Sequence, residues 1–322
     1  MISIDPQPKW SVQEEKNEPF CVQASEDSSF IAVGLSNGMI SLRSPVTGRL
    51  SYSLQQSENR YPTTSIRFNS NDPKMFLAVS ADGFIKEWTT KNPQVVWKYQ
   101  EPDNQLFCLD FNQQSDKFAT GGKDTKVRLY DYQSKKLITE YSRNEFDLET
   151  TRGHCNRVFS IKFNPNDTNV MYSGGWDDTV QVWDLRSSSS TRAIFGPHIC
   201  GDSIDIFNNT LLTCSWRTSD QIQLWDIRNY SLLRTMKWSL MADDQQCLIY
   251  SSKFLPNGQY FIAGGSGVSQ ARMFSMETHT AVGTPLSLGG SIYSIFAPQT
   301  GNCAFFGLSN GFVAQHSYST SN

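Results

Sequence analysis

The sequence has few charged residues and no excess of either sign. Only 18% of its 322 residues are Asp, Glu, Lys or Arg, and the formal net charge is -3. Because 12% of the residues are aromatic, the chain has enough apolar surface to fold rather than remain disordered. Without a cationic excess to attract phosphate groups, nucleic acid is not expected as a partner.

Long apolar runs and paired cysteines are also missing. The longest apolar runs fall far short of the roughly 18 residues that span a bilayer, and the first ten residues carry no secretory signal. Seven widely spaced cysteines contain no CxxC pair, so we expect reduced thiols without disulfides or zinc. The sequence predicts an intracellular, cytoplasmic protein with no cofactor, metal or membrane insertion, and it leaves a cytoskeletal or nuclear location open.

What the sequence does contain is an internal repeat. The segment GGKDTKVRLYD, residues 121–131, closely matches GGWDDTVQVWD, residues 174–184. When the aromatic residue near the end of this motif is used as an anchor, successive anchors lie 42 to 53 residues apart. Such a period indicates seven copies of one structural unit. The anchors are Arg43, Trp88, Tyr130, Trp183, Trp225, Phe274 and His316.

Each repeat has strand signals and almost no helix signals. Residues 179–183 approximate the alternation of a half-buried strand, and Asn37-Gly38, Asp82-Gly83 and Asn310-Gly311 are dipeptides typical of tight hairpins. Each repeat is therefore predicted to form a short antiparallel sheet. Such a sheet cannot bury both faces alone, so the copies are expected to stack around an axis.

The repeat resembles the WD-repeat (WD40) β-propeller family. The motif residues are Trp183-Asp184 and Trp225-Asp226 as intact WD pairs, Tyr130-Asp131 as a near pair, and Gly153-His154 as the intact GH pair. The anchors of the first, sixth and seventh repeats depart from the motif. The resemblance implies an all-β fold: a single domain over residues 1–322, built as a seven-bladed propeller of four-stranded antiparallel blades.

The last blade is expected to borrow a strand from the start of the chain. Only six residues follow His316, too few for a turn and a fourth strand. Residues 9–12 look like residues 96–99, the outer strand expected in the second blade. We therefore predict that the first and last segments pair in one sheet and close the ring.

Two features imitate the catalytic groups of hydrolases. The GxSxG pattern of a nucleophile elbow occurs at residues 34–38 and 307–311, but each copy lies between two predicted strands rather than before a helix. His154, Ser173 and Asp177 supply the residue types of a serine hydrolase triad, which is one alternative function. The family resemblance instead implies that these three form a structural network with Trp183, and we expect no catalytic activity.

One residue in each innermost strand is expected at the mouth of the central channel. Alignment on residues 158–161 places five aromatic residues among these seven positions, and the resemblance implies that they grip a side chain of a partner protein. Simple packing between blades is the alternative. The seven residues are Phe20, Thr64, Phe107, Phe159, Asp202, Tyr250 and Tyr293.

Further binding residues are implied by the positions that precede the loop Asp of each repeat. They are Lys123, Trp176 and Trp216, with Arg217 beside the last, and the two tryptophans are expected to be exposed anchors. Two long loops on the same face carry Glu145, Asp147, Glu149, Asp243 and Asp244. These acids favour a basic partner segment, and a solvated loop without a role is the alternative.

The leading interpretation is a non-catalytic protein-protein interaction scaffold within an intracellular multiprotein assembly, with other proteins as partners and no small-molecule substrate. Its complex could be cytoskeletal or ciliary, chromatin-bound, trafficking or signalling. An alternative starts from two WDxR sequences that end at Arg186 and Arg228. They resemble the adaptor-binding boxes of substrate receptors for cullin-type ubiquitin ligases, although such arginines also pair locally in ordinary propellers.

Overall fold

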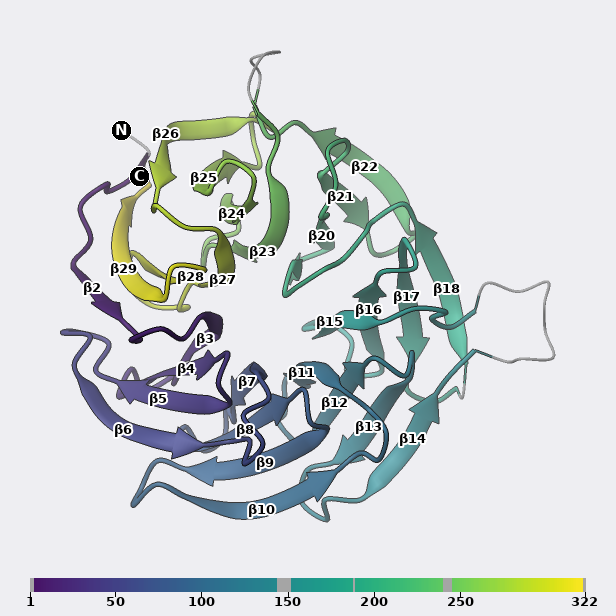
Figure 1. Cartoon of the computed structure of the whole chain (residues 1–322). Coiled ribbons are helices and arrows are strands. Elements are labelled where there is room, and N and C mark those ends of the chain that lie inside the picture. Colours follow the sequence, from purple (N-terminus) through teal and green to yellow (C-terminus); the bar gives the residue numbers. More distant parts are fainter. Residues whose placement is uncertain (1–2, 144–151, 188, 240–244, 321–322) are drawn as a thin grey trace.

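The described residues form a closed ring of seven β-sheets and contain no helix. A computed structural model describes residues 3–143, 152–187, 189–239 and 245–320, and Figure 1 shows the seven sheets arranged as blades around a central axis. No described segment is a helix that could cross a membrane. The predicted seven-bladed, all-β fold is confirmed.

The first strand of each blade lies nearest the axis, and the later strands follow outward. Blade 1 contains β3 (Pro19–Ala24), β4 (Ile31–Leu35), β5 (Met39–Arg43) and β6 (Leu50–Gln55); blade 2 contains β7 (Thr63–Phe68), β8 (Met75–Ser80), β9 (Phe84–Thr89) and β10 (Gln94–Gln100); blade 3 contains β11 (Leu106–Phe111), β12 (Lys117–Gly122), β13 (Val127–Asp131) and β14 (Leu137–Tyr141). Blade 4 contains β15 (Val158–Phe163), β16 (Val170–Gly175), β17 (Thr179–Asp184) and β18 (Ser190–Phe195); blade 5 contains β19 (Ile204–Phe207), β20 (Thr210–Cys214), β21 (Ile222–Asp226) and β22 (Ser231–Met236). Blade 6 contains β23 (Leu248–Phe254), β24 (Tyr260–Ser266), β25 (Gln270–Ser275) and β26 (Ala281–Ser287); blade 7 contains β27 (Ile292–Phe296), β28 (Cys303–Leu308) and β29 (Phe312–Ser319), joined by β1 (Ser3–Ile4) and β2 (Trp10–Gln13).

Antiparallel pairing gives the ring two distinct faces. All innermost strands begin at one face, which we call the mouth face, and the turns between the second and third strands lie there as well. The predicted tight turns are among them: Gly38, Gly83 and Gly311 have φ angles of 80°, 82° and 84°, a region that glycine adopts without strain. The turns between the third and fourth strands lie on the opposite face.

The core lies between the blades. Each hydrophobic cluster in the described residues joins two neighbouring blades, and one of them joins blade 7 to blade 1. Close packing leaves no room for a side chain at Gly174, because a Cβ there would lie 2.6 Å from the side chain of Ile199, in the segment that leads to the next blade. Burial of both sheet faces therefore depends on an unbroken ring.

The predicted closure between the two ends of the chain is confirmed. Strand β2 pairs with β29 from Trp10 opposite Gln315 to Gln13 opposite Phe312, and β1 adds two further pairs on the same strand. The ring of Trp10 lies 6.0 Å from that of Phe305, and its Nε1 donates a 2.9 Å hydrogen bond to the Pro45 carbonyl of blade 1.

A buried histidine in this closing sheet predicts a pH dependence of stability. Burial lowers the pKa of His316 from 6.5, and its Nδ1 contacts the Asp5 carbonyl at 2.9 Å. The unfolded chain therefore binds the proton more readily, so this contribution to stability is present above pH 6.5 and declines as the pH falls below it. Between about pH 7 and about pH 5 the unfolding midpoint in urea should fall more steeply for the wild type than for His316→Gln. Parallel pH profiles would contradict this.

Candidate functional site

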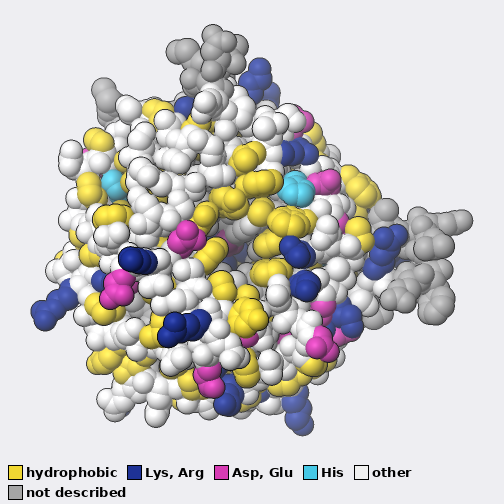
Figure 2. All heavy atoms as spheres, in the orientation of Figure 1, with side chains coloured by type: hydrophobic (Ala, Val, Ile, Leu, Met, Phe, Trp, Pro, Cys, Tyr) yellow, Lys and Arg dark blue, Asp and Glu magenta, His cyan; other side chains and the backbone are white. Residues whose placement is uncertain are grey.

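The seven residues predicted at the channel mouth line one cavity. It has a volume of about 340 Å³, and its lining includes Phe20, Thr64, Phe107, Phe159, Asp202, Tyr250 and Tyr293. Figure 2 shows hydrophobic side chains gathered around a hollow at the centre of the ring. We call this cavity the cup.

A β-bulge places most of these side chains. In six blades the pairing between the first two strands skips the residue at this level, as at Phe159, which lies between the paired residues Val158 and Ser160. A bulged residue has no partner in the ladder, so its side chain is free to turn toward the axis. Blade 5 is the exception: β19 begins only at Ile204, and Asp202 reaches the cup from the preceding segment.

The five aromatic residues that line the cup belong to a continuous arc of rings, which we call the wall. Its other members, Trp176, His198 and Trp216, are not part of the cup lining. Each ring centroid lies between 4.7 and 6.4 Å from the next, which is the range of favourable aromatic contacts. The arc runs in the order Phe107, Phe159, Trp176, His198, Trp216, Tyr250, Tyr293 and Phe20. It extends from blade 3 around to blade 1, and its wide apolar surface suits the insertion of a partner side chain.

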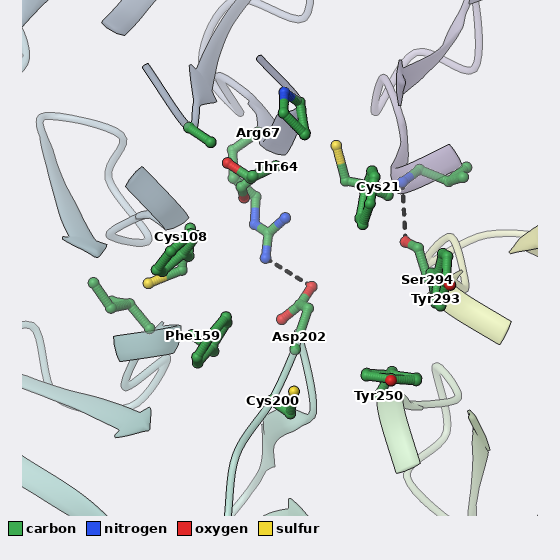
Figure 3. A pocket seen from close by; sticks show the side chains of 18 residues that line it. Cys21, Thr64, Arg67, Cys108, Phe159, Cys200, Asp202, Tyr250, Tyr293 and Ser294 are labelled. Atoms are coloured by element: carbon green, nitrogen blue, oxygen red, sulfur yellow. Dashed lines mark hydrogen bonds and ion pairs between the residues drawn. The ribbon is translucent and has the colours of Figure 1, made fainter. Parts of the chain in front are cut away.

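The floor of the cup is an ion pair that crosses the channel. Arg67 of blade 2 donates to Asp202 of blade 5 at 2.9 Å (Figure 3). It also donates to Asp110 at 3.1 Å. Lys253 lies 3.1 Å from the same Asp202 oxygen. Burial alone would raise the pKa of Asp202, but the cations Lys253, Arg67 and Lys162 outweigh it and hold the pKa well below its usual range. Asp202 is therefore charged at neutral pH.

One oxygen of this carboxylate remains open to the cup. Both contacts from Arg67 and Lys253 reach Oδ2 of Asp202, whereas Oδ1 accepts no hydrogen bond from the described residues. The Asp202 side chain is 31% exposed. Because aromatic faces also carry negative potential, the wall and the open oxygen together favour a cation.

Sequence reasoning missed the charged layer that supports the floor. Three residues beyond the cup position, five consecutive innermost strands carry charges of alternating sign: Arg67, Asp110, Lys162, Asp205 and Lys253. Neighbours in this layer pair, as Lys162 does with Asp205 at 3.5 Å. Comparison of the innermost strands at this fixed offset would have revealed the pattern.

The other predicted binding residues do not all lie in the cup. Trp176 and Trp216 are half-buried rather than exposed, because each packs against the intervening His198, which sequence reasoning also missed. Arg217 donates to the carbonyls of Gly196 and Asp220. Lys123 is exposed in a neighbouring groove. The acidic loop residues Glu145, Asp147, Glu149, Asp243 and Asp244 lie outside the described residues.

The residues of the apparent triad form a buried network. His154 contacts Asp177 at 2.8 Å and Ser173 at 2.7 Å, and the Trp183 indole donates to Ser173 at 2.7 Å. The side chains of His154 and Asp177 are 0% and 1% exposed, and Ser173 is also buried. A hydrolase would need these groups open to substrate.

Other blades place different residues in the same network. In blade 3, Glu101 accepts hydrogen bonds from Thr120 and Tyr130. In blade 1, where the anchor departs from the motif, Arg43 donates to Glu14 at 2.6 Å. Three unlike sets of buried polar groups satisfy each other at equivalent positions, which indicates a role in structure rather than in catalysis.

The two GxSxG patterns are hairpin turns. Ser36 lies between β4 and β5 and accepts a hydrogen bond from the backbone of Glu18, and Ser309 accepts one from Ser291 at the equivalent position. Each serine oxygen therefore joins a turn to the start of an innermost strand. Neither lies at the strand-to-helix turn of a nucleophile elbow.

The WDxR arginines lie on the face opposite the mouth. Arg186 and Arg228 are about 70% exposed, and each guanidinium donates through Nε and Nη2 to the aspartate of its own WD pair. Hydrogen bonding from Arg186 lowers the pKa of Asp184 to about 2. Each guanidinium therefore has a local carboxylate partner.

Comparisons with known proteins match part of the chain. The family model described as WD domain, G-beta repeat matches residues 93–131 and 147–184. A stretch covering 38% of the chain is 31% identical to "Histone acetyltransferase type B subunit 2" of Candida glabrata, and one covering 41% is 28% identical to "Ribosome biogenesis protein YTM1" of Scheffersomyces stipitis. Another, covering 39%, is 25% identical to "Guanine nucleotide-binding protein subunit beta-like protein" of Encephalitozoon cuniculi. The matched stretches span 27%, 27% and 36% of these relatives.

The family matches cover β10 of blade 2, the first three strands of blade 3 and the first three strands of blade 4. The remaining blades have the same strand order, and their anchors recur at a similar spacing even where the anchor residue differs. The chain therefore contains two segments that match WD repeats, and it folds as the seven-bladed β-propeller that its resemblance to the WD-repeat family implies.

Proposed function

We propose that this protein is a non-catalytic scaffold within an intracellular multiprotein assembly, in which residues 1–322 work as one domain. The cup binds a basic segment of a partner protein. The observation that carries this proposal is the open Oδ1 of Asp202 beneath a continuous aromatic wall. Two of the relatives are themselves described as a subunit or as subunit-like, which is consistent with work inside a complex.

A cationic side chain fits the cup better than an anionic one. A cation would meet the Asp202 oxygen and the negative faces of the surrounding rings. An anion would have to displace Asp202 from Arg67, which already bonds both Asp202 and Asp110. Because the blades hold the wall in place, little conformational entropy is lost on binding.

Loss of the aromatic wall should release the partner. We expect affinity purification with Trp176→Ala plus Phe159→Ala to lose the partners that the wild type retains. Aromatic anchors at the centre of an interface often contribute 2 kcal/mol or more, about thirtyfold in affinity. A matched control is Phe195→Ala plus Tyr52→Ala, which removes two rings that are 59% and 44% exposed on outer strands. The control should retain every partner.

A second variant tests the preference of the cup for a positively charged side chain. Asp202→Asn keeps the side-chain volume but removes the charge, so partners held through a basic residue should be lost, while urea unfolding verifies that the variant is folded. Recovery of the same partners in equal amounts by both mouth variants would refute the proposal. If only Arg186→Ala plus Arg228→Ala released them, the adaptor alternative would replace it.

A further inference from the structure

We propose that a partner segment anchored in the cup leaves it between blades 2 and 3 and runs along the adjoining groove. The site would then read an extended peptide rather than one side chain. This inference rests on the proposed function and adds the direction of the bound chain. Three observations carry it: an opening in the wall, a groove that starts at the opening, and the polar groups along that groove.

Within the part of the chain that the structure describes, the arc of rings is interrupted at blade 2. Blade 4 presents Phe159 from its innermost strand and Trp176 from its turn, whereas blade 2 has Thr64 and Ala81 at the equivalent positions. The Thr64 hydroxyl donates to the Leu106 carbonyl at 2.8 Å, so this small side chain is held against blade 3. The arc of rings accordingly ends at Phe107 on one side and at Phe20 on the other.

A groove begins at this opening. Ala81 lines both the cup and a second depression of about 360 Å³ on the same face. The two depressions are therefore adjacent, and Ala81 lies between them. The lining of the groove includes Asn59, Tyr61, Ala81, Asp82, Gln105 and Lys123.

Hydrogen bonds hold one bank of the groove in place. The Ser57 hydroxyl donates to Asp82 at 2.6 Å and accepts from the backbone nitrogen of Tyr61 at 3.0 Å. The Tyr61 side chain is nevertheless 46% exposed. A fixed loop that presents an open aromatic ring can contact a ligand without ordering cost.

The opposite bank offers a cation without a partner. Lys123 is exposed and forms no ion pair with the described residues, so its ammonium can bind a main-chain carbonyl or a carboxylate of the ligand. The side-chain amides of Asn59 and Gln105 can bond peptide groups on the way. This chemistry suits an extended peptide with a basic anchor residue and an acceptor farther along.

The test uses dodecapeptides selected from a random displayed library against the wild-type protein, with affinity measured by fluorescence anisotropy. Ala81→Trp fills the opening and should weaken binding at least tenfold. Ser266→Trp adds the same ring at the equivalent position of blade 6, away from the groove, and should change affinity less than twofold. Lys123→Glu should weaken binding about fivefold. Urea unfolding verifies that each variant is folded.

The outcomes distinguish the proposed path of the peptide along the groove from binding in the cup alone. If Trp176→Ala plus Phe159→Ala abolishes binding while Ala81→Trp and Lys123→Glu bind as the wild type, the cup is the site and the path is wrong. Equal loss in Ala81→Trp and Ser266→Trp would also overturn the path. If the wall variant binds every selected peptide normally, the proposed function itself fails.

Discussion

Deletion of residues 1–13 is expected to lower the free energy of unfolding by about 5 kcal/mol, because it removes the strands that close the ring. The deletion takes away Trp10, which is buried and packs against Phe305. It also leaves one edge of β29 without the backbone partners that β1 and β2 supply. An unpaired edge of this kind is both destabilising and prone to aggregation.

Urea unfolding of the deleted and full chains measures this effect. Trp10→Ala alone should cost about 3 to 5 kcal/mol. Lys9→Ala is the control: Lys9 is exposed, and its backbone hydrogen bond to Gln315 survives the substitution. If the deleted chain had the midpoint and slope of the full one, the closing strands would contribute nothing to stability.

Glu101→Ala is expected to cost about 3 to 5 kcal/mol, because it removes the acceptor at the centre of a buried network. Its carboxylate accepts hydrogen bonds from Thr120, Tyr130, Arg128 and Asn104 at 2.5 to 2.9 Å. The side chain is only 1% exposed, so water cannot replace these contacts. Polar groups left buried without partners carry the full cost of desolvation.

Glu140→Ala is the matched control for this second variant. Glu140 also pairs with Arg128, at 2.9 Å, but its side chain is 33% exposed. Solvent screening should limit its cost to less than about 1 kcal/mol. Urea unfolding of both variants gives the two free energies of unfolding. Equal losses would show that the burial of Glu101 does not increase its contribution to stability.

The repeat allowed much of the fold and the positions of the cup residues to be predicted. The spacing of the repeats was enough to locate the blades whose anchors depart from the motif. The anchor itself can vary, because a blade tolerates any buried side chain that finds a polar partner at the anchor position. Arg43 demonstrates this, since Glu14 stands where blade 4 has His154. Alignment of the strands also brought the seven cup residues together, because the same bulge recurs in six blades.

The contacts across the ring could not be predicted in this way. Arg67 and Asp202 are 135 residues apart and come from blades that are not neighbours, so no local pattern links them. The partial burial of the two tryptophans could not be predicted from the sequence either. It depends on His198, which stands between Trp176 and Trp216 in space and has no counterpart in the repeat motif.

The pairing of Ser3 with Ser319 also decides how the molecule can be held. Strand β29 starts at the mouth face and runs away from it, so both ends of the described chain emerge on the far side of the same blade. A surface, label or neighbouring subunit attached through either end would therefore lie next to the face opposite the mouth. The cup would then point outward, ready for a second molecule to approach unobstructed.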